Sequence, residues 1–231
     1  MKNSFKAQFS ILLFLLSFSL FAQEGETRSI DRFTELKVSE GIKLIAKKGK
    51  ENSITLDVYR IDAEDVITEV RGGRLSVRIA KGFRTSRSRR IAAVLTYTED
   101  LESINVSTSA EVRIDGMLEL DKLDVVASTS GTIDLKVAAK EIKLGVSTSG
   151  RIDIEGKAEE LEVSASTGSV IYAYNLEVDE AYSRANTGAD VRINATERLK
   201  ASAGTGGTIS YRGNPKTDVR TNTGGSVRRS N

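Results

Sequence analysis

Asp134 and Asp153 are the residues whose type and spacing are best suited to chemistry. They occupy the same position in two consecutive copies of a repeated motif. If the copies stack as neighbouring strands, the two carboxylates lie about 5 Å apart. Such a pair could share a proton, bind Ca²⁺ or cleave a polysaccharide by acid/base chemistry. The alternative is a solvated surface on which Arg113 and Arg151 offset the repulsion. We favour it because Ca²⁺ takes about 6–8 oxygen ligands.

The densest basic segment, residues 81–90, is a second candidate site. We predict that it forms a loop whose arginines could bind phosphate or carboxylate groups of a glycan or of an outer-membrane lipid. These arginines are Arg84, Arg87, Arg89 and Arg90. The competing interpretation is an ordinary solvated loop, because a run of charges usually has no further role.

Composition excludes much of the usual catalytic chemistry. The sequence contains no His and no Cys. Histidine-based triads, thiol nucleophiles and the usual zinc sites are therefore not available. We predict that the protein is not an enzyme and has no catalytic residues, no metal site and no other cofactor.

The first 22 residues are predicted to be a secretory signal peptide. Lys2 and Lys6 precede an apolar stretch, residues 9–21, and Ala22 is the expected last residue before cleavage. An uncleaved membrane anchor is the alternative, although the stretch is short for a membrane span. We predict an exported protein, located in the periplasm, on the outer-membrane surface or in the medium. Its mature part, residues 23–231, is expected to form one domain without an integral membrane segment.

The mature chain is expected to be close to neutral. Loss of Lys2 and Lys6 lowers the number of basic residues from 34 to 32, which equals the 32 acidic residues. This balance gives no support to a nucleic-acid-binding function.

A motif of the type Ser-Thr-Ser-Gly or Asn-Thr-Gly recurs through residues 101–231. Successive central threonines are 21, 19, 19, 20, 18 and 18 residues apart; they are Thr108, Thr129, Thr148, Thr167, Thr187, Thr205 and Thr223. A fixed period near 20 residues is typical of a solenoid. We therefore predict an all-β, single-domain, right-handed parallel β-helix with coils of about 18–21 residues.

Alternating apolar residues on both sides of each threonine predict two strands per coil. Leu123, Val125 and Ala127 precede Thr129, and a second alternating run follows it. The motif between the strands is then a turn. We expect positive φ angles at one glycine position of this turn, occupied by Gly131, Gly150, Gly207 and Gly225.

Two columns of side chains are expected to run along the stacked coils. The outward column five residues before each threonine alternates in charge where charges adjoin, as stacking favours; it contains Ser103, Asp124, Lys143, Glu162, Tyr182, Lys200 and Asp218. The threonine column is interpreted as structural, with hydroxyls bonding from coil to coil. Its alternative is a surface that binds ice or a crystalline sugar.

Residues 30–100 show the same alternation of apolar residues in short runs, but with less regular spacing. Six strands are predicted, two for each of about three further coils: residues 33–38, 42–46, 54–59, 66–70, 75–79 and 91–98. At the other end, the last coil finishes near Val227 with little sequence left to cover its edge. A homo-oligomer formed through coil edges is therefore expected as one option.

Nearly all of the mature chain resembles a known family, the putative auto-transporter adhesins with a head GIN domain. The resemblance rests on a set of short motifs: Phe33-x-x-Leu36-x-Val38-x-x-Gly41-Ile42-x-Leu44, Val70-x-x-Gly73-x-Leu75-x-Val77, Leu101-Glu-Ser-Ile104, Tyr211-Arg-Gly-Asn-Pro215 and Gly224-Gly225-Ser226. The turns depart from the Ser-Gly-Gly-Ser type that is usual in the family. The resemblance implies an exported, surface-associated β-helix and provides no catalytic residues.

These observations predict a non-catalytic, adhesin-like binding protein or cell-envelope structural protein that presents a repetitive sheet surface. Its expected partners are an extracellular polysaccharide, an envelope component or another protein, since long shallow faces suit extended ligands. The alternative is a carbohydrate-active enzyme that cleaves a polysaccharide with Asp134 and Asp153.

Overall fold

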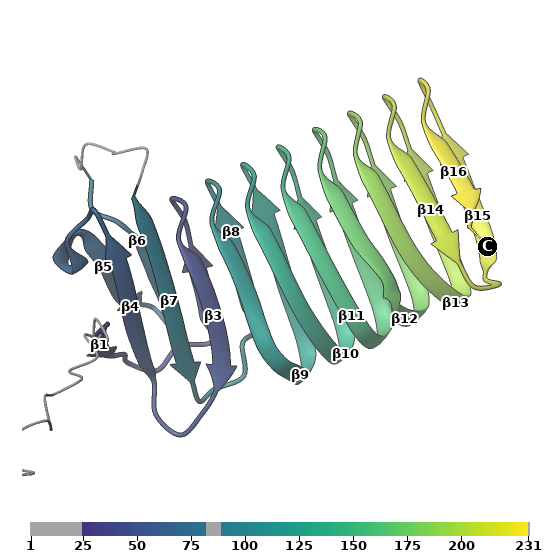
Figure 1. Cartoon of the computed structure of the whole chain (residues 1–231). Coiled ribbons are helices and arrows are strands. Elements are labelled where there is room, and N and C mark those ends of the chain that lie inside the picture. Colours follow the sequence, from purple (N-terminus) through teal and green to yellow (C-terminus); the bar gives the residue numbers. More distant parts are fainter. Residues whose placement is uncertain (1–24, 82–88, 231) are drawn as a thin grey trace, which may run out of the picture.

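The protein is a flattened β-solenoid. The computed structural model describes residues 25–81 and 89–230, so the predicted signal peptide lies outside the described residues. In this part of the chain sixteen strands belong to a single sheet, and the one short helix is the 3₁₀ turn η1, Ala63–Asp65. Figure 1 shows the strands stacked along a rod, with a row of tight turns along one side. The predicted all-β solenoid is confirmed.

The strands fall into an irregular and a regular group. The irregular group comprises β1 (Glu26–Ser29), β2 (Glu35–Val38), β3 (Lys43–Lys48), β4 (Ser53–Tyr59), β5 (Val66–Arg71), β6 (Arg74–Ile79) and β7 (Arg90–Tyr97). The regular group comprises β8 (Ser103–Ser107), β9 (Glu111–Ser128), β10 (Thr132–Val146), β11 (Arg151–Ala165), β12 (Val170–Ala185), β13 (Asp190–Ala203), β14 (Thr208–Arg212), β15 (Lys216–Thr221) and β16 (Ser226–Arg229).

The rod has two faces because each long strand from β9 to β13 contributes to both. The first face contains, in spatial order, β1, β4, β7, β3, the amino-terminal halves of β9–β13, β14 and β16. The second face contains β5, β6, β2, β8, the carboxy-terminal halves of β9–β13, and β15. From β8 onward all neighbours are parallel and advance one coil at a time, so that Ile133 lies beside Ile152 and Leu144 beside Val163.

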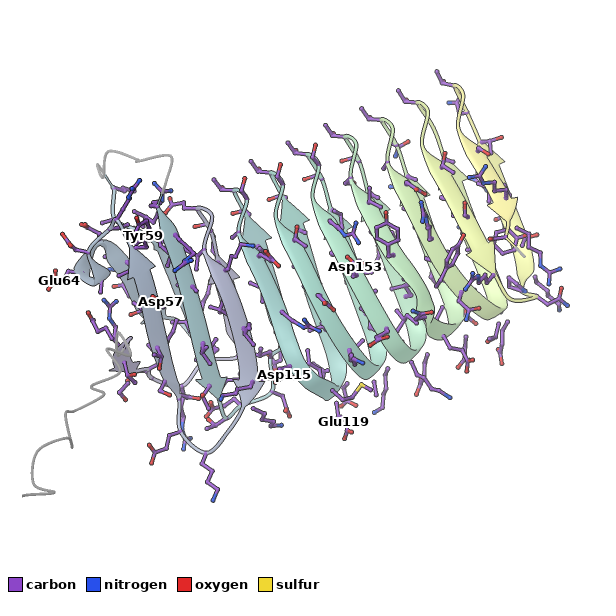
Figure 2. The ribbon with its side chains drawn as sticks, in the orientation of Figure 1. Asp57, Tyr59, Glu64, Asp115, Glu119 and Asp153 are labelled. Carbon is purple, nitrogen blue, oxygen red and sulfur yellow. The ribbon has the colours of Figure 1, made fainter. Side chains whose placement is uncertain are left out.

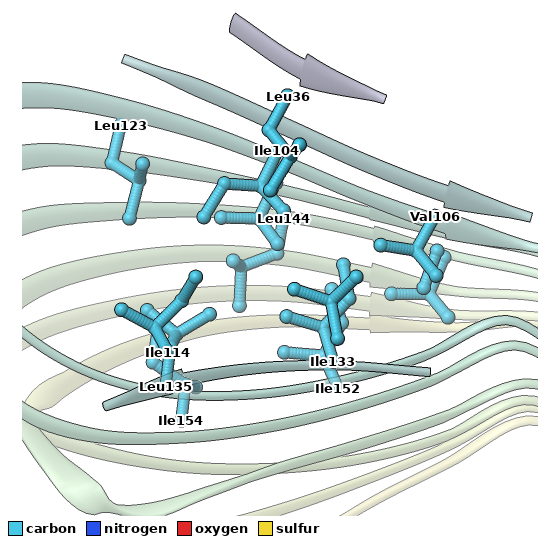
Figure 3. Packing of buried hydrophobic residues seen from close by; sticks show 14 of the residues in the cluster. Leu36, Ile104, Val106, Ile114, Leu123, Ile133, Leu135, Leu144, Ile152 and Ile154 are labelled. Atoms are coloured by element: carbon cyan, nitrogen blue, oxygen red, sulfur yellow. The ribbon is translucent and has the colours of Figure 1, made fainter. Parts of the chain in front are cut away.

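The core consists of columns of inward side chains, one residue from each coil. On the first face, equivalent positions hold Val112, Ile133, Ile152, Ile171, Val191 and Ile209, each at most 1% exposed. On the second face, Ile104, Val125, Leu144 and Val163 form a similar column. Figure 3 shows two of its members, Ile104 and Leu144, together with Ile133 and Ile152 of the first face. A single coil cannot bury these side chains by itself, so stacking supplies about 1.5–3 kcal/mol for each large residue.

The turns differ from the expectation for their glycines. Positive φ occurs at the seven central threonines, between 44° and 54°, and at the residue after each of them, between 59° and 74°. Two consecutive left-handed residues make a type I′ turn. Gly131, Gly150, Gly207 and Gly225 do not have positive φ, so that prediction is wrong. They are required for space, because a Cβ at Gly131 or Gly150 would lie 2.4 Å from a carbonyl oxygen of the preceding coil.

Backbone hydrogen bonds, not threonine hydroxyls, connect one turn to the next. Ser109 N donates to Thr129 O, and Ser130 N to Thr148 O, each at 2.9 Å. The same bond is repeated through the turn of Thr223. Among the seven threonines only Thr223 makes a side-chain hydrogen bond, to the adjacent Asn222. All seven side chains are exposed, which corrects the predicted hydroxyl ladder.

The irregular group forms three layers, but not in sequence order. All six predicted strands are present. The pair β2–β3 is next to β8–β9, and β6–β7 lies outside it, parallel to it. The pair β4–β5 is outermost and antiparallel to its neighbours, so it is not a coil of the predicted kind. The β5–β6 hairpin turns at Gly72 and Gly73, both with positive φ, and this short turn forces the reversed direction.

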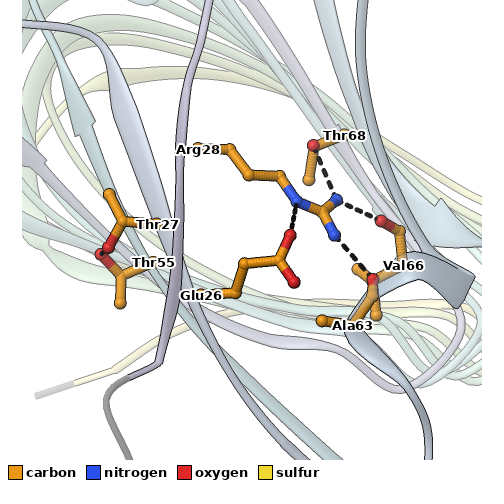
Figure 4. Close-up of polar contacts among 7 residues, drawn as sticks. All are labelled: Glu26, Thr27, Arg28, Thr55, Ala63, Val66 and Thr68. Carbon is orange, nitrogen blue, oxygen red and sulfur yellow. Dashed lines mark hydrogen bonds and ion pairs between the residues drawn. The ribbon is translucent and has the colours of Figure 1, made fainter.

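The amino-terminal end of the rod is covered. On the first face β1 pairs antiparallel with the edge of β4. On the second face Arg28 donates to Val66 O and to Thr68 Oγ1, which belong to β5, and to Ala63 O of η1 at 2.7 Å (Figure 4). The side chain of Arg28 is only 22% exposed. Exposed sheet edges can pair with other chains, and here the edges of β4 and β5 are partly occupied by β1 and by Arg28. None of the described helices is long and apolar enough to cross a bilayer.

Candidate binding surface on the first face

Outward side chains of the first face form an open groove over the regular coils. It has a volume of about 480 Å³, within the usual range of about 300–1,000 Å³ for ligand sites. We call it the tyrosine groove; it is lined by Arg113, Asp134, Leu135, Lys136, Asp153, Ile154, Glu155, Tyr172, Tyr174, Asn175 and Arg212. The alternation of the strands positions these residues. Ile152 and Ile171 point into the core, so Asp153 and Tyr172 point out.

Arginines from other coils stack on the two tyrosines. The guanidinium carbons of Arg151 and Arg192 lie 4.3 Å and 4.7 Å from the ring centre of Tyr172. The guanidinium of Arg212 lies 4.2 Å from the ring of Tyr174. Each such contact is worth about 0.5–1 kcal/mol at an exposed site. Both tyrosines are half-buried and stacked, so their positions are set before any ligand arrives.

Asp134 and Asp153 are neighbours, as predicted, but both face arginines. They are register partners on β10 and β11. Arg151 donates twice to Asp153, at 2.6 and 3.0 Å, and this hydrogen bond is the main reason that the pKa of Arg151 is raised. Arg113 lies 3.8 Å from Asp134. Figure 2 shows Asp153 on the open face of the sheet. This arrangement supports the solvated, charge-balanced interpretation over an acid/base pair, which needs a carboxyl group in a less polar setting.

The described residues contain no cluster of three or more Asp and Glu side chains placed to hold a metal ion. The two neighbouring aspartates therefore do not extend into a larger oxygen cage within this part of the chain, and Ca²⁺ requires about 6–8 oxygens.

The predicted basic site is only partly visible. Arg84 and Arg87 lie outside the described residues. Arg89 donates to Glu40 O at 3.4 Å and has one buried nitrogen without a partner, whereas Arg90 is exposed at the start of β7. Strand β7 is separated from β10 by β3 and β9. The structure therefore does not bring Arg89 and Arg90 to the tyrosine groove, and ligand binding by this segment stays a prediction.

The predicted alternation of charge is present on the second face, where Lys143 is the register partner of Asp124 and Glu162 and lies 3.9 Å from Glu162. Beside this column, Lys122 and Lys143 lie 2.7 and 3.1 Å from Glu141. Hydrogen bonds from the two lysines lower the pKa of Glu141, and Glu141 in turn raises the pKa of Lys143. These groups are well solvated, so each pair adds little stability. The register of the coils places these charges side by side.

Sequence reasoning missed the tyrosines. A signal was available, because only 6% of the residues are aromatic and two of them, Tyr172 and Tyr174, occupy outward positions of one strand. The stacking partners could not be identified as easily, because Arg151 and Arg212 are distant in sequence and belong to other coils.

The fold defines a class of protein: a mostly parallel β-solenoid with a long polar face. A family model described as "Putative auto-transporter adhesin, head GIN domain" matches residues 32–215. The match covers most of the sequence, and the chain belongs to this family. No protein with a curated description matches it.

Solved structures share the fold. A putative adhesin from Bacteroides fragilis superposes with a TM-score of 0.77 at 19% identity, over 88% of this chain and 94% of that one. A putative adhesin from Parabacteroides merdae gives 0.71 at 19% identity, over 89% and 95%. A putative lipid binding protein from Parabacteroides distasonis gives 0.70 at 17% identity, over 91% and 98%. At these identities the likeness concerns the fold alone.

Proposed function

We propose that this protein is an exported, non-catalytic, adhesin-like protein whose tyrosine groove binds an extended carbohydrate chain. The observation that carries the proposal is the pair of half-buried tyrosines, fixed by stacked arginines within a groove of charged and amide groups. Side chains that are held in place before binding lose little entropy on binding.

The chemistry of the groove suits hydroxyl-rich ligands. Arg113, Lys136 and Arg212 supply donors, while Asp134, Asp153 and Glu155 supply acceptors. Sugar hydroxyls both donate and accept, so they can use such a mixed surface, whereas a ligand of one charge sign meets repulsion as well as attraction. Tyr174 adds an apolar ring surface with a polar tip.

The shape of the groove suits an extended ligand. Its lining residues run from Arg113 on β9 to Arg212 on β14, and successive coils are about 4.8 Å apart. The groove therefore crosses several coils, so a linear chain could make similar contacts at each one. Membership of the adhesin family supports a binding role. Export rests on the predicted signal peptide and on the family, and cell fractionation tests it.

Binding should depend on Tyr174 and Arg212. We expect Tyr174→Ala and Arg212→Ala each to weaken binding of the best ligand on a glycan array by about tenfold or more, because each removes a pre-stacked group that lines the groove. Titration calorimetry would measure the loss. The chain offers a matched control in Tyr59→Ala, since Tyr59 is also stacked on an arginine, Arg60 at 5.1 Å, but lies on β4 away from the groove (Figure 2).

Two results would count against the proposal. One is equal affinity for the wild type and Tyr174→Ala, with Tyr59→Ala unchanged. The other is polysaccharide cleavage by the wild type that disappears in an Asp134→Asn, Asp153→Asn double variant, which would establish the enzymatic alternative.

A further inference from the structure

The last coil of the rod leaves core positions open. Val219 continues the second-face column of Leu144, Val163 and Ala201, which are 2%, 2% and 1% exposed, yet Val219 is 43% exposed. Val227 ends the first-face column in the same way. Among the described residues, β15 pairs only with β13 and β16 only with β14, so each strand has a free edge.

The backbone shows which residues face that edge. Asn222 N donates to Ala203 O, Ser226 N to Gly207 O and Ser230 N to Tyr211 O. Even-numbered residues therefore bond to the preceding coil. Because consecutive residues of a strand point their polar groups to opposite sides, the odd-numbered residues present theirs to the free edge. These residues are Thr217, Val219 and Thr221 on β15, and Val227 and Arg229 on β16.

We propose that this edge binds a second copy of the same chain in a two-fold symmetric dimer. A two-fold axis perpendicular to the faces reverses strand direction, so β15 pairs antiparallel with the partner's β15. Such an interface uses the same surface on both copies. It would use the unpaired backbone groups of β15 and cover the exposed Val219.

Charge selects one register. Odd-numbered residues must face odd-numbered residues of the partner for the hydrogen bonds to form. The possible registers of the two β15 strands therefore differ by two residues. Val219 opposite the partner's Val219 places Asp218 opposite the partner's Arg220, twice by symmetry. A shift of two residues in one direction opposes Asp218 to the partner's Asp218, and in the other direction Arg220 to the partner's Arg220. Opposite charges across strands stabilise pairing and like charges disfavour it, so the central register is preferred.

This register does not carry over to β16. Gly225 N donates to Asn222 O across the two-residue turn, so Arg228, and not Val227, lies level with Val219. The paired strand is therefore β15, and β16 only borders the contact.

The other end of the rod is built differently, since β1 pairs with the edge of β4 and Arg28 occupies the Val66 carbonyl of β5. Because a two-fold interface uses the same surface on both copies, assembly through β15 closes at two copies. Because the axis is perpendicular to the faces, both tyrosine grooves lie on the same side of the dimer. A dimer would thus double the proposed contact surface.

Charge exchange tests the register. Light scattering or sedimentation of the purified chain should give the mass of a dimer. Asp218→Arg and Arg220→Asp should each weaken association by about tenfold or more, since each converts two attractive pairs into repulsive ones. The double variant Asp218→Arg, Arg220→Asp should restore the dimer. Asp124→Arg, at the same coil position inside the rod, should leave association unchanged.

A single cysteine tests the axis independently. The chain has no Cys. Facing residues of a hydrogen-bonded antiparallel pair have Cα atoms about 5.5 Å apart, within the usual range for a disulfide. Val219→Cys should therefore form a covalent dimer on mild oxidation, far faster than Thr148→Cys on a distant turn. A monomeric wild type, a dimer insensitive to both single charge reversals, or cross-linking of Val219→Cys no faster than the control would overturn the proposal.

Discussion

Residues 25–100 and residues 101–230 build the same two faces by different routes. In the second region each coil is laid on the one before it, always parallel, with steps of 18 to 21 residues. In the first region the chain places β2–β3 next to the regular coils, moves outward to β4–β5, and then fills the space between with β6–β7. The regular coils are therefore added one after another in the same direction, whereas the irregular end finishes with a reversal of strand direction.

The two ends of the rod differ accordingly. The irregular region finishes in antiparallel strands whose edges are covered by β1 and by Arg28. The regular region finishes in β15, all of whose residues are exposed. Stability should therefore be greatest inside the rod and least at the carboxy-terminal coil, and the following predictions test this contrast.

Core truncation should have the largest effect, and its size should depend on the layer. Leu144→Ala removes a side chain that is 2% exposed, so we expect a loss of about 2–5 kcal/mol in the free energy of unfolding. Val219→Ala, in the same column at the open end, should cost less than about 1 kcal/mol in a monomer. Chemical denaturation measures both. Equal losses would mean that the two layers are packed alike.

Loss of the Arg28 side chain should loosen the closed end. Arg28→Ala removes three hydrogen bonds to η1 and β5 made by a largely buried guanidinium, so we expect a loss of about 1.5–3 kcal/mol. Limited proteolysis should then cut within residues 60–66. Arg71→Ala is the control, because Arg71 is 82% exposed and contacts only Glu69. Similar cleavage in both variants would show that Arg28 does not hold this end.

A turn residue better suited to positive φ should stabilise the regular coils. Thr148 has a φ of 49°, which is unfavourable for a β-branched side chain, and its exposed hydroxyl makes no hydrogen bond. Asn tolerates this conformation, so Thr148→Asn should stabilise the fold by about 1 kcal/mol, seen as a higher melting temperature. Thr132→Asn, which alters a strand position, should give no gain. A lower melting temperature for Thr148→Asn would contradict the assigned strain.

The smallest expected effect is on the pH dependence of stability, through Glu99 at the junction between the two regions. Glu99 accepts hydrogen bonds from Thr98 and Asn52, and these lower its pKa below the usual value of 4.5. A lowered folded-state pKa contributes stability above the unfolded-state value, and this contribution is lost as the pH falls through the folded-state value. Glu99→Gln should therefore reduce the drop in melting temperature between neutral pH and acid. An unchanged drop would show that this carboxylate is not involved.

The repeat made much of the regular region predictable. A constant step between threonines predicts which residues become neighbours, so the pairing of Asp134 with Asp153 and the alternating charges around Lys143 follow from the sequence. The role of the turn glycines was harder to predict. Gly131 is needed because the backbone of the preceding coil lies too close for a Cβ atom, and this contact cannot be recognised from the sequence of its own turn.

The irregular region was predictable strand by strand but not in its order. Without a repeat, no local sequence pattern predicts that β6–β7 lies between β2–β3 and β4–β5. That order follows from which layer covers the remaining apolar surface, a long-range property. The tyrosine groove could not be predicted from local sequence either. The contact of Tyr172 with Arg151 and Arg192 depends on the positions of side chains in three coils.

Amide hydrogen exchange tests most directly the contrast between a closed and an open end. It should be measured on the Asp218→Arg variant at a concentration at which sedimentation shows a monomer, so that the proposed dimer does not protect the edge. Local opening is easiest where few buried contacts hold a segment. We expect slow exchange in β4, β6 and β9–β12, and fast exchange in β15 and β16. Protection of β15 and β16 equal to that of β11 and β12, or early loss of protection in β4 and β6, would contradict the assignment of the open end.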